Sequence, residues 1–183
     1  IVATDPTGKI LYTIGQKGRA GSSDGGFDEA EFYRPQGIAY LNKTLYVADT
    51  ENHLLRKVDL EKKIVTTIAG TGKQGAERRP NKSPAHETAL SSPWDLSFYP
   101  NNDQLAIAMA GTHQLWSYHV NSETVSVLAG NGNESIDDGA YPHNSLSQPS
   151  GVSTLGAQLY LVDSETSSLR VLEKNIVRTL IGT

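Results

Sequence analysis

The chain contains no cysteine among its 183 residues. This absence excludes disulfides, thiolate metal sites, cysteine nucleophiles and dithiol redox motifs. It does not identify the compartment, because both reducing and oxidising environments hold proteins without cysteine. We leave the compartment open and favour a soluble, cytoplasmic location.

Long apolar runs and a secretory leader are also absent. No apolar run approaches the roughly 18 residues of a transmembrane helix, and residues 1–15 lack the basic start and apolar stretch of a signal peptide. We therefore expect no association with a membrane. Because the chain does not begin with Met, we expect it to be a processed product or a fragment.

The charge balance does not indicate a nucleic-acid-binding protein. There are 16 Lys and Arg against 20 Asp and Glu, which gives a formal net charge of -4, whereas a phosphate backbone requires a basic face. The basic residues gather only in Lys73–Lys82, which we interpret as a solvated loop. Fingerprints of a P-loop, a dinucleotide-binding turn and a His-Glu-x-x-His metal site are missing.

Internal repeats are the strongest signal that the sequence contains. Three units open at Pro35, Pro93 and Pro149, and each continues with three more apolar pieces of similar pattern. In the first unit these pieces are 45–49, 54–58 and 65–70. They are short, rich in β-branched and aromatic residues and bounded by Gly, Asn, Asp or Pro, which is typical of strands. Four short strands in a repeated unit predict the blades of a β-propeller.

The repeat predicts an all-β fold with about fourteen strands. We place the three blades at 34–70, 92–130 and 148–182, and residues 1–15 resemble the outer half of a preceding blade. Propellers typically have four to eight blades, so we expect 1–183 to be a partial propeller. Its open ends should expose apolar side chains and could support self-association. We predict that the last blade contributes four residues to this surface: Leu159, Leu161, Leu169 and Val171.

Several strings resemble those of a known repeat family. Asn52-His53-Leu54, together with Arg34-Pro35-Gln36-Gly37, resembles an NHL repeat. The string Ala-Met-Ala-Gly-Thr-His-Gln-Leu-Trp at 108–116, and residues 163–170, resemble the propeller of thioredoxin-NHL proteins. This resemblance implies a six-bladed ring, of which about three and a half blades are present. It also implies a thioredoxin-like domain before the propeller, which this segment does not contain.

The loops between the second and third strands of each unit are expected to share one end of the propeller with the long linkers. Long loops on a rigid scaffold often carry function. His53 and His113 hold the same register there, so they could approach a metal or an anion together with Glu51 or Glu165. The favoured interpretation is that His53 hydrogen-bonds to loop backbone and holds the turn.

Two acid–base pairs recur with a spacing of seven residues. They are Asp49 with Arg56 and Asp163 with Arg170. Each pair would span the hairpin between the second and third strands, and we expect a partly buried, bidentate, structural contact. The middle unit has Met109 and Trp116 at these places, which indicates a position that serves packing.

Four further residues are candidates for binding a partner at the rim of the propeller. Trp94 follows the proline that opens the middle unit, and an aromatic side chain there could stack on a ligand or a partner. The others are Arg34, Tyr141 and His143. No residue shows the spacing of a nucleophile with its base, and we assign no catalytic residue, no metal and no cofactor.

The function that we favour is a non-enzymatic scaffold for an unidentified protein partner. This hypothesis depends on the family resemblance as well as on the loops. Two alternatives stay open. The first is a metal-dependent enzyme resembling propeller lyases that gather His ligands from several blades, and the second is an RNA-binding NHL domain.

Overall fold

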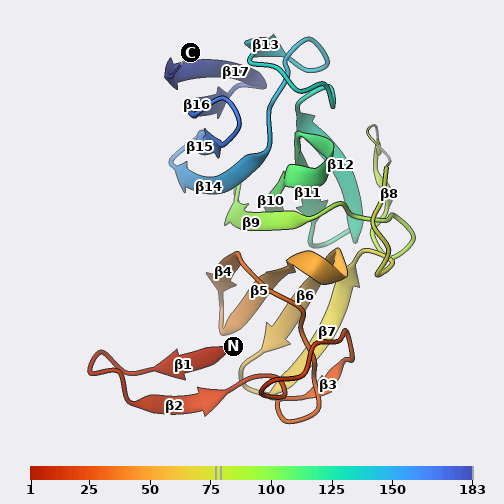
Figure 1. The fold of residues 1–183 in the computed structure, drawn as a ribbon, viewed down its shortest axis with the longest axis vertical. Helices are drawn as coiled ribbons and strands as arrows, with labels where there is room; N and C mark the ends of the chain where they lie inside the picture. The colour runs from red at the N-terminus through yellow and green to blue at the C-terminus, as the bar shows by residue number, and fades with distance from the viewer. Residues whose placement is uncertain (77, 79, 183) are drawn as a thin grey trace.

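The protein is all-β and consists of four antiparallel sheets that follow one another along the chain (Figure 1). The computed structural model describes residues 1–76, 78 and 80–182. Within these residues the helical elements are two single 3-10 turns, η1 (Thr50–Asn52) and η2 (Ala110–Thr112). No helix in this part of the chain is long and apolar enough to cross a membrane.

The first sheet has two strands and each of the other three has five. Sheet 1 contains β1 (Val2–Thr4) and β2 (Ile10–Thr13). Sheet 2 contains β3 (Gly25–Gly26), β4 (Ile38–Leu41), β5 (Thr44–Asp49), β6 (Leu54–Asp59) and β7 (Ile64–Ala69). Sheet 3 contains β8 (Ser83–Pro84), β9 (Pro93–Phe98), β10 (Gln104–Met109), β11 (Gln114–His119) and β12 (Thr124–Ala129). Sheet 4 contains β13 (Gly139–Ala140), β14 (Pro149–Leu155), β15 (Gln158–Asp163), β16 (Ser168–Glu173) and β17 (Ile176–Ile181).

Each five-stranded sheet is a meander of four strands with a fifth, two-residue strand on its outer edge. In sheet 2, for example, Gly25 of β3 pairs with Val65 of β7. The described residues therefore form seventeen strands rather than the predicted fourteen. The difference arises because each linker lays two residues along the outer strand of the next sheet before it enters the inner strand. The prediction of an all-β partial propeller is confirmed.

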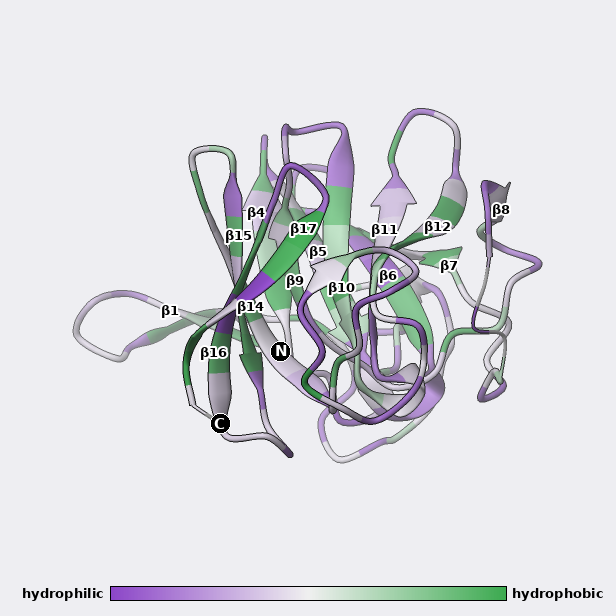
Figure 2. Cartoon of the chain, turned by 90° about the horizontal axis from the view of Figure 1, so that it is seen from above, coloured by the Kyte–Doolittle hydropathy of each residue, from purple (hydrophilic) through white to green (hydrophobic). Residues whose placement is uncertain are grey.

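The core lies between consecutive sheets. Side chains of a strand alternate between its two faces, and β10 shows what this does. Leu105 and Ile107 pack toward sheet 2, whereas Ala106 and Ala108 pack toward sheet 4, and all four are fully buried. Figure 2 shows that apolar residues concentrate in the strands and that the loops are mainly polar.

The apolar surface at the end of the propeller is not built from all of the residues that we predicted. Leu159 and Leu161 are fully buried against sheet 3, and Val171 is only 2% exposed. The opposite face of sheet 4 carries Val162, 49% exposed, and Leu180, 48% exposed. The error at Leu159 and Leu161 has a simple cause, because a shift of one residue along a strand moves a side chain to the other face. Leu169 and Val171 pair with Val162 and Tyr160, so they do lie on the outer face, although Val171 is buried there.

Candidate binding face

Three loops and the linkers between sheets meet at one end of the molecule, which we call the loop-bearing end. It consists of the loops 50–53, 110–113 and 164–167 with the linker segments that leave β2, β7 and β12 and those that enter β4, β9 and β14. Between these segments each linker reaches the opposite end, where β3, β8 and β13 pair with the first residues of β7, β12 and β17. Each loop is tied to the linker before its own sheet by an equivalent backbone hydrogen bond. The bonds are Glu51 N–H to Tyr33 O (3.1 Å), Gly111 N–H to Ser91 O (3.0 Å) and Glu165 N–H to Ser147 O (3.1 Å).

Arg56 fixes the first of these linkers through a buried guanidinium. Its Nη1 donates to Asp49 Oδ2 at 2.8 Å and to the backbone oxygen of Glu31 at 2.8 Å. Its Nη2 donates to Asp24 Oδ1 at 2.8 Å and to the backbone oxygen of Ser23 at 2.9 Å. The contact with Asp49 is therefore not bidentate, as predicted, because the guanidinium is shared between a sheet carboxylate and a linker carboxylate.

Arg170 repeats this arrangement in sheet 4. Its Nη1 lies 3.2 Å from Asp163 Oδ2 and 2.6 Å from the backbone oxygen of Ser145. Its Nη2 lies 3.0 Å from Asp138 Oδ1 and 2.9 Å from the backbone oxygen of Asp137. The side chains of Arg170 and Asp163 are both fully buried. Through its contacts with both segments, Arg170 also joins a linker to a sheet.

Burial dominates the electrostatics of the two sheet carboxylates. It raises the pKa of Asp49, and hydrogen bonds from Asn52, Tyr33 and Arg56 oppose that rise. Burial likewise raises the pKa of Asp163, against hydrogen bonds from Ser147 and Arg170. Every polar group that contacts these carboxylates stabilises their ionised form, as a structural ion pair requires.

In sheet 3, uncharged side chains hold the linker that precedes the sheet. Trp116 and Met109 lie in the core as fully buried side chains. Trp116 Nε1 donates to Gln114 Oε1 at 3.0 Å, and Gln114 Nε2 donates to the backbone oxygen of Arg78 at 2.7 Å. The sequence analysis missed Gln114, although a polar residue at the start of a buried strand was a signal for it.

His53 and His113 each accept a hydrogen bond from the linker that enters the next sheet. Ser92 N–H donates to His53 Nδ1 at 3.0 Å, and Gln148 N–H donates to His113 Nδ1 at 3.2 Å. Both histidines have left-handed backbone conformations, with φ of 53° and 55°. Burial lowers the pKa of His53, and the negative charge of Glu51 opposes this effect.

The structure does not bring the histidines and glutamates together as metal ligands. The residues that it describes contain no group of three or more His, Asp or Glu side chains arranged to hold a metal ion. At the third loop, Ser167 takes the place of the histidine, again with a left-handed φ of 49°. Glu51 and Glu165 are exposed.

The remaining rim candidates do not share one end of the molecule. Arg34 is exposed at the loop-bearing end, and its guanidinium carbon lies 5.8 Å from the ring centroid of Tyr33. Trp94 is half-buried at the start of β9. Tyr141, 37% exposed, and His143, also exposed, follow Ala140, which pairs with Ile176 beside the β16–β17 hairpin, so these two residues lie at the opposite end. Arg79, from the basic segment 73–82, lies outside the described residues.

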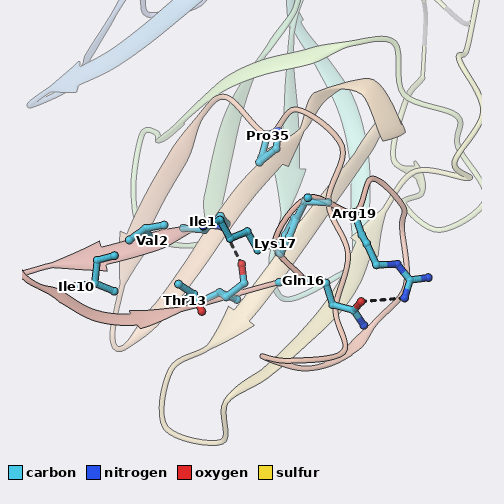
Figure 3. Close-up of a pocket in the computed structure, with 12 residues that line it drawn as sticks. Ile1, Val2, Ile10, Thr13, Gln16, Lys17, Arg19 and Pro35 are labelled. Atoms are coloured by element: carbon cyan, nitrogen blue, oxygen red, sulfur yellow. Dashed lines mark hydrogen bonds between the residues drawn. The ribbon is translucent and has the colours of Figure 1, made fainter.

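A hollow of 310 Å³ lies between the β1–β2 hairpin and the residues before β4 (Figure 3). Its walls include Val2 and Ile10, which are 55% and 59% exposed, together with Phe32 and Pro35. None of the rim candidates contributes to its lining. Its lining also includes residues 15–19 of the first linker, so the hollow extends from the open apolar side of sheet 1 to the loop-bearing end.

Asp95 is a further polar residue that the sequence analysis did not single out. It lies in the inner strand β9, at the position that Gly37 and Gly151 hold in the neighbouring repeats. Its Oδ2 accepts the backbone N–H of Val152 at 2.9 Å. A Cβ added at Gly37 would lie 2.5 Å from the Cα of Asp95, so the inner strands of sheets 2 and 3 are in close contact.

Solved structures with this architecture define the class of protein. A Bacteroides ovatus auxiliary nutrient binding protein aligns with a TM-score of 0.63 at 15% identity, over 99% of this chain and 46% of that one. A chain from the structure of a nidogen–laminin complex aligns with a TM-score of 0.54 at 20% identity, over 78% of this chain and 44% of that one. These likenesses concern the fold alone, and they identify a partial propeller.

Sequence comparison then identifies the kind of propeller. The NHL repeat model matches residues 32–58. NHL repeat-containing protein 2 of Gallus gallus is 41% identical over the whole chain, which covers 28% of that protein. SUPPRESSOR OF QUENCHING 1, chloroplastic, of Arabidopsis thaliana is 45% identical over 89% of the chain and 16% of that protein. The chain is an NHL-repeat protein homologous to these two proteins, and it spans about a quarter or less of their lengths.

Proposed function

We propose that the chain is a non-enzymatic scaffold that presents its loop-bearing end to a protein partner. One observation carries this proposal. Buried contacts from Arg56, Gln114 and Arg170 fix every linker between the described sheets, while residues such as Arg34 and Glu165 stay exposed. A surface whose loops are fixed in advance loses little conformational entropy when it binds.

The two alternatives have less support. In a metal site, His53 and His113 could each offer only Nε2, because Nδ1 of each ring already accepts a backbone N–H. RNA binding would need a basic face, and the net charge is -4. Metal analysis of the purified chain, with a His53→Ala, His113→Ala control, tests the first alternative, and filter binding to single-stranded RNA tests the second.

Site-specific photo-crosslinking tests the scaffold proposal. A photoreactive residue placed at Glu165, which is exposed in the loop 164–167, probes the loop-bearing end, and the same residue at Asn102 probes the hairpin at the opposite end. We expect Glu165 to give a crosslink to one protein that Asn102 does not give. We also expect Arg34→Ala to weaken this crosslink, since truncating a contact residue lowers affinity.

The control variant is Asn102→Ala, which should leave the crosslink from Glu165 unchanged. Equal crosslinking from both ends would contradict the proposal, because binding of the partner would then not depend on the loops. Absence of any protein crosslink from the loop-bearing end, in extract from the source cells, would also contradict it.

A further inference from the structure

Two junctions between sheets share one unusual geometry. In each, a histidine side chain receives the N–H of the residue before the proline that opens the next inner strand. Ser92 and Gln148, which donate these bonds, have left-handed φ values of 51° and 61°. A left-handed φ is unfavourable for residues such as serine and glutamine. The proline that follows restricts the backbone of these residues further. Arg34, before Pro35, has a similar φ of 49°, so the fold itself sets this backbone and the imidazole adds a side-chain contact to it at two of the three junctions.

The bond depends on the protonation state of the ring. A neutral imidazole has one N–H donor and one acceptor nitrogen, whereas the protonated ring has two donors. Because a backbone N–H points at Nδ1, the neutral ring must carry its proton on Nε2. A protonated ring would direct a second N–H at Ser92 or at Gln148, and both donors would lose their partner.

We propose that His53 and His113 are proton-sensitive latches, which fix the linkers entering sheets 3 and 4 when neutral and release them when protonated. The latches act at the loop-bearing end, where they set the entry of β9 and β14. Acidification would therefore loosen two specific junctions without requiring the sheets themselves to unfold.

The charges that face the two rings differ. Glu51, in the same loop, acts on His53, and burial of that ring disfavours its charged form. The negative charge of Asp163, at the end of β15 in the next sheet, faces His113. Asp163 is itself engaged by Arg170 and by the N–H of Ser147. In sheet 3 the uncharged Met109 takes the place that corresponds to Asp163, so His53 has no such carboxylate from its neighbouring sheet.

Nuclear magnetic resonance of the chain tests the latches directly. Nitrogen-15 shifts report which ring nitrogen carries a proton, and at about pH 7.5 we expect Nε2 alone in both rings. As the pH is lowered, the amide proton of Ser92 should shift together with the ring signals of His53, and that of Gln148 together with the ring signals of His113. The exposed rings of His86 and His143 provide internal controls.

A matched pair of variants separates the latch from a general effect of acid. Asn tolerates a positive φ and offers an oxygen acceptor, but it does not titrate. In His53→Asn, the amide of Ser92 should become independent of pH while that of Gln148 still shifts. His113→Asn should give the converse result. A proton on Nδ1 at neutral pH, or an amide shift of Ser92 that persists in His53→Asn, would overturn the proposal.

Discussion

Arg56 is a buried cation whose charge is balanced by Asp49 from the sheet and Asp24 from the linker. Removing one partner of a buried ion pair leaves the others uncompensated. We expect Arg56→Ala to lower the free energy of unfolding by about 2–4 kcal/mol, as measured by urea denaturation. The matched control is Arg178→Ala, which breaks the exposed pair with Glu173 and should cost less than about 1 kcal/mol. Equal effects of the two variants would mean that burial of Arg56 contributes nothing.

His53 gives a prediction for the dependence of stability on pH. Its pKa is lowered in the folded protein from the ordinary value of 6.5, so the unfolded chain binds a proton more readily than the folded chain. The stability contributed by the neutral ring is therefore present above about pH 6.5 and is lost as the pH falls below it. We expect the decrease in free energy of unfolding below about pH 6.5 to be smaller in His53→Asn. An unchanged pH profile would show that His53 has the same pKa in both states.

The sequence could reveal some of these residues and not others. Asp49 and Arg56 lie seven residues apart on one hairpin, and a repeated spacing within a hairpin indicates a contact between its strands. Asp24 lies 32 residues from Arg56, in a linker whose path the strand pattern does not determine. The second carboxylate was missed for this reason, as was its equivalent Asp138. A hydrogen bond between His53 and backbone was predicted, but not that its donor, Ser92, belongs to the linker that enters the next sheet.

At the scale of the elements, the close contact of the inner strands gives a sharp test. A methyl group at Gly37 would meet the Cα of Asp95 at 2.5 Å, whereas at Gly151 the nearest atoms lie 3.9 Å away. We expect Gly37→Ala to destabilise the protein by about 1–3 kcal/mol through overpacking, and Gly151→Ala to have little effect. Thermal unfolding of the two variants provides the comparison. A Gly37→Ala protein as stable as Gly151→Ala would mean that β4 and β9 can separate without cost.

The strands themselves were more predictable than their faces. Their short length, their β-branched residues and their bounding turns recur three times, so a repeat identifies each of them. The two-residue strands β3, β8 and β13 carry no β-branched or aromatic pattern, because they read Gly-Gly, Ser-Pro and Gly-Ala. The wrong face for Leu159 and Leu161 has a different cause: β15 carries apolar residues on both its buried and its open face, so the pattern does not distinguish the two.

At the scale of the whole molecule, large exposed apolar side chains collect at the two ends of the chain of sheets. On one side they are Val2, Ile10, Leu11, Tyr12, Ile38 and Tyr40; on the other they are Leu155, Val162, Ile176, Leu180 and Ile181. Within the described residues, β9 to β12 of the middle sheet contribute none. The corresponding faces of sheets 2 and 3 are covered by the next sheet, so the repeat itself indicates that sheet 4 presents a sheet-binding surface.

This distribution predicts self-association of the 183-residue chain. Apolar patches of several hundred Å² are rare on stable monomers, and covering them contributes about 25 cal/mol per Å² before the costs of association. We expect sedimentation velocity at about 50 µM to show oligomers, and Val162→Glu to reduce them, because a carboxylate in the contact would lose its hydration. Ile64→Glu is the control, since Ile64 is 42% exposed on the outer strand of sheet 2, away from both ends. A monomer at this concentration, or equal effects of the two variants, would show that the end faces do not attract each other.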